Sequence, residues 1–276
     1  MTDRYCLVGE NVSRSPSPAM MNAAFGAMGL DAVYTSENVA RHDFNERFAR
    51  LKEQTSGMNV TIPYKSLVIP MLDELDEVAS RIGAVNVIKR SGDRFLGFNS
   101  DAQGILVPLR EHGKSTVRRV LLVGAGGAAR AFCEAMNQAG CADVVVAVRD
   151  PSKGENFIKE MSKVFPGMKF SFTDISLLRD AEFDLIFNAT PIGTGEQRLP
   201  DSLKRVIYGR STVFDAVYRP MKTELLRTAE MRGCTTIFGY EMLLNQGTLA
   251  FEIWTGKTAP KEVMKRSLLE SLEAAA

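Results

Sequence analysis

The sequence is poor in the residues that build disulfide frameworks and metal sites. It holds four cysteines and two histidines among 276 residues. The cysteines are Cys6, Cys133, Cys141 and Cys234. They form no C-x-x-C pair, so we interpret them as reduced thiols and expect neither a disulfide framework nor a zinc site. His42 and His112 lie in charged surroundings far from any cysteine, so we interpret both as surface residues and expect no bound metal.

Long hydrophobic runs and an excess of charge of one sign are also missing. No apolar segment approaches the roughly 20 residues that span a bilayer. The net charge is +1 and the two signs are interspersed, which argues against nucleic-acid and membrane partners. The first residues, MTDRYCLVGE, lack the apolar core of a signal peptide, so we expect a cytoplasmic protein.

The sequence does contain a nucleotide-binding fingerprint at residues 120–130, VLLVGAGGAAR. Four apolar residues precede Gly124, Gly126 and Ala129, which follow the pattern G-x-G-x-x-A. A helix-forming segment and a second apolar run, 143–148, complete a strand–turn–helix–strand unit of about 30 residues. In such a unit Gly124 allows the tight turn and Gly126 leaves room for a pyrophosphate at the helix N-terminus. The context favours a nucleotide site over a merely structural tight turn.

Strands and helices alternate on both sides of the fingerprint, which predicts an α/β protein with two domains. Strands are expected at 4–9, 32–39, 57–62, 84–90, 94–100, 120–123, 143–148, 168–173, 183–190, 211–218 and 235–238. Helices are expected at 18–29, 43–53, 73–83, 102–113, 128–140, 150–165, 221–233 and 239–256, and near the C-terminus. The predicted domains are 1–101 with 239–276, and a Rossmann-type domain at 102–238. The C-terminal helices are expected to pack back on the first domain, with the substrate in the crevice between domains.

Several polar residues occupy positions that suit either structure or chemistry. Lys65 follows a short strand that stops at Pro63, where a lysine can project into a cleft or simply be solvated. Asn86 and Asn99 lie in predicted strands, where asparagine is disfavoured, so each needs a polar partner. Asp101 precedes a helix, and both helix capping and catalysis remain open for it.

Eight motifs occur in one order between about Gly9 and Gly256. They are SRSPSP, NVTIPYK, GAVNV, GFNSDAQG, GAGGAAR, NATPIGT, FDAVYRP and GYEMLLNQG. Together they make the chain resemble the shikimate dehydrogenase family. The resemblance implies a reversible, nicotinamide-dependent oxidation of a ring hydroxyl of shikimate to the 3-dehydro ketone, in aromatic amino acid biosynthesis. It also implies a small-molecule substrate and a monomer or homodimer.

The resemblance assigns roles to the polar residues. Lys65 is expected to exchange the proton with the reacting hydroxyl, and Asp101 to hold and polarise the same site. Ser15 and Ser17 match the paired serines that hold the substrate carboxylate, although turn chemistry beside proline is an alternative. The remaining expected substrate ligands are Thr61, Asn86, Gln246 and Tyr218.

The resemblance does not decide between NADP and NAD, because two neighbouring residues favour opposite cofactors. Where NADP-dependent members read Asn-Arg-Thr, this chain reads Val148-Arg149-Asp150. Arg149 could pair with a 2′-phosphate, whereas Asp150 would repel it or accept from the ribose of NAD. We expect NADP, with NAD or dual use as the alternative. The other expected cofactor-binding residues are Gly124, Ala125, Gly126, Gly127, Ala128, Asn188, Thr190, Gly193, Gly239 and Met242. For Met242 ordinary core packing is an alternative.

The chain also departs from the family pattern near the substrate loop. Ser13 and Arg14 stand where the family often has His-Ser, Met21 replaces a usual histidine, and Ser100 replaces a threonine. A cation such as Arg14 at the mouth of a carboxylate site could redirect the enzyme to quinate or a related cyclic acid. A non-catalytic ligand sensor is a further alternative, but it predicts loss of the acid/base pair, and Lys65 and Asp101 are both present.

Overall fold

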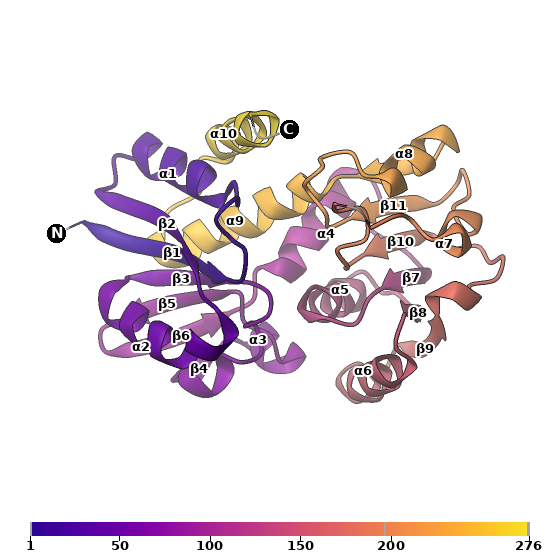
Figure 1. The fold of residues 1–276 in the computed structure, drawn as a ribbon, viewed down its shortest axis with the longest axis horizontal. Coiled ribbons are helices and arrows are strands. Elements are labelled where there is room, and N and C mark those ends of the chain that lie inside the picture. The colour runs from indigo at the N-terminus through magenta and orange to yellow at the C-terminus, as the bar shows by residue number, and fades with distance from the viewer. Residues whose placement is uncertain (1, 196, 275–276) are drawn as a thin grey trace. The chain divides into compact units, whose positions relative to one another are not determined.

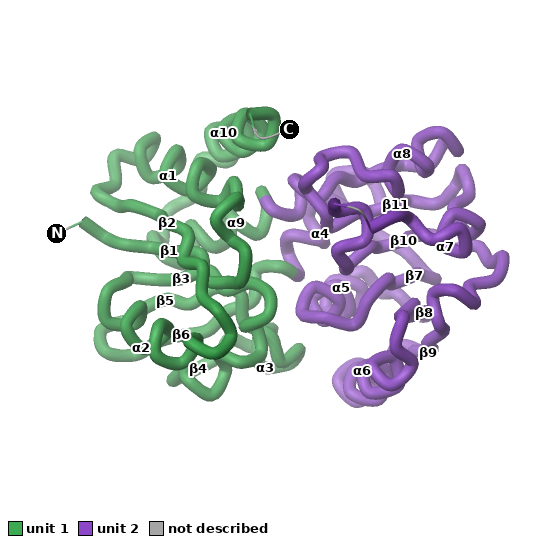
Figure 2. Tube along the Cα trace, viewed as in Figure 1, with its two compact units in different colours: residues 1–101, 244–275 green, residues 102–243, 276 purple. Residues whose placement is uncertain are grey.

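The computed structural model describes residues 2–195 and 197–274, and the chain divides into two compact units (Figure 2). Unit 1 comprises Met1–Asp101 and Leu244–Ala275, and unit 2 comprises Ala102–Leu243. The prediction put the second boundary before residue 239, whereas the structure has it inside helix α9, Gly239–Thr255.

Unit 1 is built on a six-stranded mixed sheet in the order β2-β1-β3-β5-β6-β4 (Figure 1). The strands are β1 Asp3–Gly9, β2 Ala32–Asn38, β3 Gly57–Val60, β4 Glu74–Leu75, β5 Val87–Ser91 and β6 Arg94–Phe98. β1 pairs in parallel with β2 and β3, and β5 and β6 form an antiparallel hairpin. The helices are α1 Ser17–Ala27, α2 Phe44–Gln54, α3 Glu77–Ile82, most of α9, and α10 Lys261–Glu273.

Alternate residues of β1 pack against helices on opposite faces of this sheet. Tyr5 stacks at 4.7 Å between ring centroids on Trp254 of α9, on one face. Cys6 and Val8 join the core that contains Phe44 and Phe48 of α2, on the other face. Trp254 also donates from Nε1 to the carbonyl of Ile88 at 2.9 Å, and this contact fixes α9 to the sheet. The C-terminal helices thus return to the N-terminal sheet, as the sequence predicts.

Unit 2 holds a second six-stranded sheet, entirely parallel, in the order β12-β11-β10-β7-β8-β9. The strands are β7 Arg119–Val123, β8 Asp143–Val148, β9 Lys169–Asp174, β10 Leu185–Asn188, β11 Thr212–Asp215 and β12 Thr235–Ile237. The helices are α4 Asp101–Glu111, α5 Gly127–Gln138, α6 Pro151–Val164, α7 Asp201–Arg205 and α8 Glu224–Met231. With β7 as the first strand, this order is that of a doubly wound dinucleotide-binding sheet. The predicted α/β fold class is confirmed.

Two short elements differ from the prediction. The acidic segment 73–83, predicted as one helix, begins with strand β4, and α3 starts only at Glu77 because the Asp76 carboxylate accepts from the N–H of Ala79 at 2.8 Å. Helix α7 was not expected from the sequence. Five residues are too few to show helical periodicity.

Candidate active site and cofactor cradle

Lys65 and Asp101 form an ion pair that is almost buried within unit 1. Lys65 Nζ contacts Asp101 Oδ2 directly, and their side chains are 13% and 5% exposed. Lys65 lies in the loop after β3, where its carbonyl accepts from the N–H of Val85 at 2.8 Å. Asp101 is the first residue of α4. Two residues 36 positions apart are thus held together with little access to water, where a charge interaction is stronger than at the surface.

Asn86 joins this pair through its amide. Its Nδ2 donates to Asp101 Oδ1 at 2.9 Å and to Ser100 Oγ at 3.0 Å, and lies 3.4 Å from Gln246 Oε1. Its Oδ1 accepts from the N–H of Ser100 at 2.7 Å. The structure therefore gathers four predicted site residues, Lys65, Asn86, Asp101 and Gln246. Ser100, fully buried among them, was noted in the sequence only as a mild departure from the family pattern.

Asn99 explains the start of helix α4. Its Oδ1 accepts from the N–H of Asp101 at 3.0 Å, and its Nδ2 donates to the carbonyl of Ala84 at 2.9 Å. Asp101 is itself the first residue of the helix, so it is Asn99, and not Asp101, that supplies the side-chain acceptor at the start of α4. The Asp101 carboxylate is thereby left to Lys65 and Asn86.

The paired serines lie at the start of α1. Ser15 Oγ donates to Ser17 Oγ at 3.1 Å and accepts from the N–H of Ser17 at 3.2 Å. The second bond is the local turn chemistry that the alternative interpretation expects, and it holds the two hydroxyls together. The loop after β1 lies against the loop after β3, because Glu10 N–H donates to the carbonyl of Ile62 at 3.2 Å and Thr61 N–H to that of Val8 at 2.9 Å. Both loops follow neighbouring strands of one sheet.

The glycine-rich turn of unit 2 has the shape of a phosphate cradle. Gly124 has φ +105°, and a Cβ there would lie 2.6 Å from Thr190 Cγ2, so only glycine fits. A Cβ on Gly126 would meet nothing within 4 Å, so this position faces open space. Gly126 also precedes α5 without any side-chain cap on the helix. The uncapped N–H groups and the open space fit a dinucleotide pyrophosphate. Ala125 lies in this turn, Gly127 and Ala128 are the first two residues of α5, and all three are partly exposed.

Asn188 and Thr190 stabilise the conformation of the loop that follows β10. Asn188 is fully buried, and its Oδ1 accepts from both the N–H and the hydroxyl of Thr190, at 3.1 and 2.6 Å. Its Nδ2 donates to Asp215 Oδ1 at 2.9 Å and to the carbonyl of Ile192 at 3.1 Å. Asn188 therefore fixes the loop from inside, whereas Thr190 and Gly193, which has φ +98°, are partly exposed.

Three further predicted residues lie near the end of unit 2. Gly239 starts α9 where a Cβ would lie 2.8 Å from the carbonyl oxygen of Ala216, so its role in the fold is close packing. Met242 is 8% exposed, in keeping with core packing, and Tyr218 is partly buried.

Arg149 and Asp150, the two residues that favour different cofactors, follow the end of β8 and differ in their contacts. Asp150 caps α6, because its Oδ1 accepts from the N–H of Ser152 at 3.0 Å and from its hydroxyl at 2.7 Å. These bonds hold the pKa of Asp150 below its usual value. Arg149 is exposed, and among the described residues its guanidinium has no hydrogen-bond or ion-pair partner. The carboxylate is thus engaged locally while the cation remains available to an anionic ligand.

Asp215 is a buried carboxylate that links this network to α8. Its oxygens accept from Asn188 Nδ2, from the N–H of Val217 at 3.0 Å and from Thr223 Oγ1 at 2.6 Å. Burial nevertheless raises the pKa of Asp215 to about 6, because three donors do not replace full hydration of the charge.

Replacing Asp215 with asparagine should alter how stability depends on pH. A folded pKa above the unfolded value of 3.8 means that this group contributes stability that is fully present below about pH 4 and lost as pH rises through about 6. Between pH 7 and pH 4, the free energy of unfolding of wild type should therefore rise by on the order of 3 kcal/mol relative to that of Asp215→Asn, measured by denaturant unfolding. Asp174→Asn is the control, since hydrogen bonds from Ser176 lower the pKa of Asp174 and predict the opposite sign. An Asp215→Asn difference that does not vary with pH would contradict the prediction.

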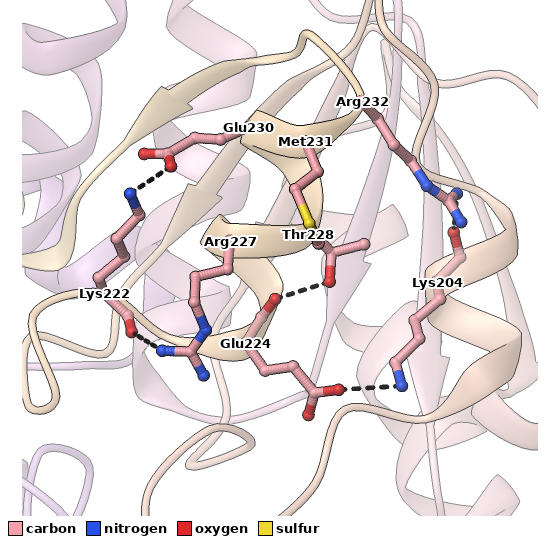
Figure 3. Close-up of a pocket in the computed structure, with 8 residues that line it drawn as sticks. All are labelled: Lys204, Lys222, Glu224, Arg227, Thr228, Glu230, Met231 and Arg232. Atoms are coloured by element: carbon pink, nitrogen blue, oxygen red, sulfur yellow. Dashed lines mark hydrogen bonds and ion pairs between the residues drawn. The ribbon is translucent and has the colours of Figure 1, made fainter.

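A separate hollow of about 500 Å³ lies on α8 of unit 2 (Figure 3). Its two lysines pair with its two glutamates: Lys204 contacts Glu224 at 2.9 Å, and Lys222 contacts Glu230. None of the predicted site residues lines it, and we do not assign the substrate to it. Within residues 2–195 and 197–274 there is no group of metal-ligating side chains. No helix in those ranges is long and apolar enough to span a membrane.

Comparison with protein families agrees with the motifs. The family model described as Shikimate dehydrogenase substrate binding domain matches residues 7–88. The models described as Shikimate / quinate 5-dehydrogenase and Shikimate 5'-dehydrogenase C-terminal domain match residues 108–196 and 239–269.

Individual relatives are similar over nearly the whole chain. The shikimate dehydrogenase (NADP(+)) of Geobacter metallireducens is 38% identical over 97% of this chain and 96% of its own length. That of Moorella thermoacetica is 39% identical, over 99% and 95%. The crystal structure of shikimate 5-dehydrogenase from Thermus thermophilus in complex with NADP(H) and shikimate has a TM-score of 0.85 and 30% identity, over 98% of this chain and all of that one. The chain therefore belongs to the shikimate dehydrogenase family of NADP-dependent oxidoreductases.

Proposed function

We propose that this chain catalyses the reversible NADP-dependent reduction of 3-dehydroshikimate to shikimate. The observation that carries the proposal is the nearly buried Lys65–Asp101 pair, held by Asn86 beside Gln246. A protonated amine beside a carboxylate, largely withdrawn from water, is suited to exchange a proton with a hydroxyl or carbonyl oxygen. A ligand sensor of the same fold would have no need for this pair.

The two units take different parts in the proposed reaction. Unit 1 holds the acid/base pair and the serine loop, and binds the substrate. Unit 2 holds the glycine cradle and Arg149, and binds the cofactor. When bound, NADPH supplies the hydride that reduces the ketone carbon.

Lys65 supplies the proton in the reduction. As the carbonyl oxygen of the substrate gains negative charge, the Lys65 ammonium donates a proton to it, and the product is the ring hydroxyl. Asp101 holds the ammonium in place, while Asn86 keeps the carboxylate aligned through Oδ1. Lys65 then regains a proton from solvent. In the oxidation the same proton moves in the opposite direction.

The remaining predicted ligands of unit 1 fix the substrate. The hydroxyls of Ser15 and Ser17 donate to its carboxylate, and each hydrogen bond to a charged group contributes about 1.5–3 kcal/mol. Thr61, Asn86 and Gln246 hold the ring hydroxyls. Tyr218 of unit 2 is the remaining proposed substrate ligand. Gln246 presents an amide at the Asn86 side chain, which suits a neutral hydroxyl better than a carboxylate.

Cofactor selectivity follows from the end of β8. The exposed Arg149 guanidinium attracts the 2′-phosphate of NADP, while Oδ1 of the Asp150 carboxylate is engaged by Ser152 in the cap of α6. The position of Asp150 is therefore accounted for by the helix cap, without a ribose hydroxyl of NAD. Asn188 supports the cofactor loop indirectly, and Thr190 and Gly193 are the residues of that loop that reach the dinucleotide.

A stoichiometry measurement tests the proposal. The purified protein is mixed with 3-dehydroshikimate and limiting NADPH, and cofactor oxidation is followed by absorbance while shikimate is quantified by mass spectrometry. We expect one shikimate formed for each NADPH oxidised over many turnovers. Binding of both ligands without turnover would overturn the proposal in favour of a sensor.

A further inference from the structure

A chain of buried hydrogen bonds connects Tyr34 to Asp101 within unit 1, and its inner half has no role in the reaction described so far. Tyr34 Oη donates to Asn59 Oδ1 at 2.7 Å, and Asn59 Nδ2 donates to the carbonyl of Asn86 at 3.0 Å. The Asn86 side chain in turn donates to Asp101 Oδ1 at 2.9 Å. Tyr34, Asn59 and Asn86 are 2%, 6% and 2% exposed, so water does not compete for these bonds.

The direction of these bonds is fixed from the Tyr34 end. Burial raises the pKa of Tyr34 well above its ordinary value of 10.0, so its hydroxyl stays protonated and acts as a donor. Because Asn59 Oδ1 accepts the hydrogen bond from the Tyr34 hydroxyl, Asn59 Nδ2 is directed to the Asn86 carbonyl. The main chain of Tyr34 is itself held on both sides by Asn22, whose Oδ1 and Nδ2 bond its N–H and carbonyl at 2.8 and 2.9 Å.

Asn59 joins strands that carry different parts of the site. It lies on β3, from which the chain leads into the Lys65 loop, and it bonds Asn86 just before β5; Figure 1 shows β2, β1 and β3 side by side. The Asn86 carbonyl accepts from Asn59 Nδ2 and from the N–H of Val60 at 2.9 Å. Without the amide of Asn59, one of these two contacts between Asn86 and β3 is lost. The direction of the Asn86 side chain toward Asp101 then becomes less well fixed.

We propose that Asn59, oriented by the Tyr34 hydroxyl, is a positioning residue for the Lys65–Asp101 pair. It acts through Asn86, by fixing the main chain from which the amide reaches Asp101. The proposal rests on the proposed function, because it gives that site its inner support. Neither Tyr34 nor Asn59 touches the substrate in this account.

Tyr34→Phe tests the proposal, because it removes the hydroxyl and keeps the ring. We expect kcat for 3-dehydroshikimate to fall by about three- to tenfold, the scale of one hydrogen bond, with KM changed by less than about twofold. A less well fixed Asn86 leaves the Asp101 carboxylate, and with it the Lys65 ammonium, less well aligned for proton transfer. Asn59→Ala should lower kcat in the same way and by more.

Thr55→Val is the matched control. Thr55 is buried in unit 1, and its hydroxyl donates to the carbonyl of Leu51 at 2.8 Å, apart from the Tyr34–Asp101 chain. It should lower the unfolding midpoint as Tyr34→Phe does, while kcat stays as in wild type. If Tyr34→Phe also changes only the midpoint, Asn59 and Tyr34 are merely structural and the proposal is overturned.

The ¹H–¹⁵N NMR signals of the Asn86 side-chain amide separate this proposal from the proposed function, because that amide donates to Asp101 Oδ1. Tyr34→Phe should shift these signals, and Thr55→Val should not. This readout needs no turnover. A wild type that fails to reduce 3-dehydroshikimate would overturn the proposed function, while unmoved Asn86 amide signals in Tyr34→Phe would overturn the positioning role in either case.

Discussion

Replacing Lys65 with alanine should lower kcat for 3-dehydroshikimate reduction by about 10²–10⁴-fold, the usual contribution of a general acid or base. The ammonium is the acid that the structure places beside Asp101, and the side chains around it, Asn86 and Gln246, carry no proton of comparable acidity. The measurement is the steady-state rate of NADPH oxidation. Because the substitution also leaves the Asp101 carboxylate buried without its cation, thermal unfolding should be recorded on the same sample.

Lys89→Ala is the control for this experiment. Lys89 is a partly buried lysine of the same sheet, and its Nζ donates to the carbonyl of Ile253 at 2.6 Å. Its loss should affect stability and leave kcat within about twofold of wild type. Lys65→Met keeps the apolar part of the side chain and serves if Lys65→Ala unfolds. A folded Lys65 variant that retains more than about a tenth of the wild-type rate would exclude Lys65 as the proton donor.

Replacing Arg149 with alanine should raise KM for NADPH by about 10- to 100-fold, the scale of a hydrogen bond between a cation and a phosphate. KM for NADH should change by less than about twofold, because NADH lacks the 2′-phosphate. Arg149 is exposed, so added salt should weaken NADPH binding to wild type more than to the variant. Initial rates over a range of cofactor and salt concentrations measure all three effects.

Asp150→Asn is the matched comparison for Arg149. Asparagine can still accept from Ser152 and cap α6, so the substitution removes the charge and keeps the loop. We expect the ratio of NADPH to NADH efficiency to change by less than about threefold. A large gain for NADPH in Asp150→Asn would mean that the carboxylate opposes the phosphate after all. An unchanged KM in Arg149→Ala would place the 2′-phosphate elsewhere.

The cofactor half of the protein was predictable because its signal is local. Gly124, Gly126 and the start of α5 follow one another in the sequence, and a strand, a tight turn and a helix in that order leave few alternatives. The six-stranded parallel sheet then follows from the alternation of apolar runs and helices. The state of Asp150 was not predictable in this way, because a carboxylate before a helix can cap it or face a ligand, and only the bonds to Ser152 decide between them.

The substrate half depends on contacts between distant residues, which local patterns do not reveal. From spacing alone Lys65 was as compatible with a solvated surface as with a cleft, and the family motifs decided in favour of the site. Its pairing with Asp101 requires the loop after β3 and the start of α4 to meet. Asn59 lies in β3, which ends at Val60, and its side chain bonds Tyr34 and Asn86, which are 25 and 27 positions away in the sequence. A polar residue in a strand indicates that it has a hydrogen-bond partner, but the sequence does not show which residue that partner is.

The most direct test of the account is a comparison of kcat/KM for the purified chain with shikimate and with quinate, each with NADP and with NAD. We expect kcat/KM for shikimate with NADP to exceed that of each of the other three combinations by about tenfold or more, because Arg149 is proposed to select the 2′-phosphate and unit 1 to hold the ring hydroxyls. Comparable rates with NAD, or a preference for quinate, would contradict it. That result would mean that Asp150 and Arg14 redirect the enzyme to another cofactor or acid.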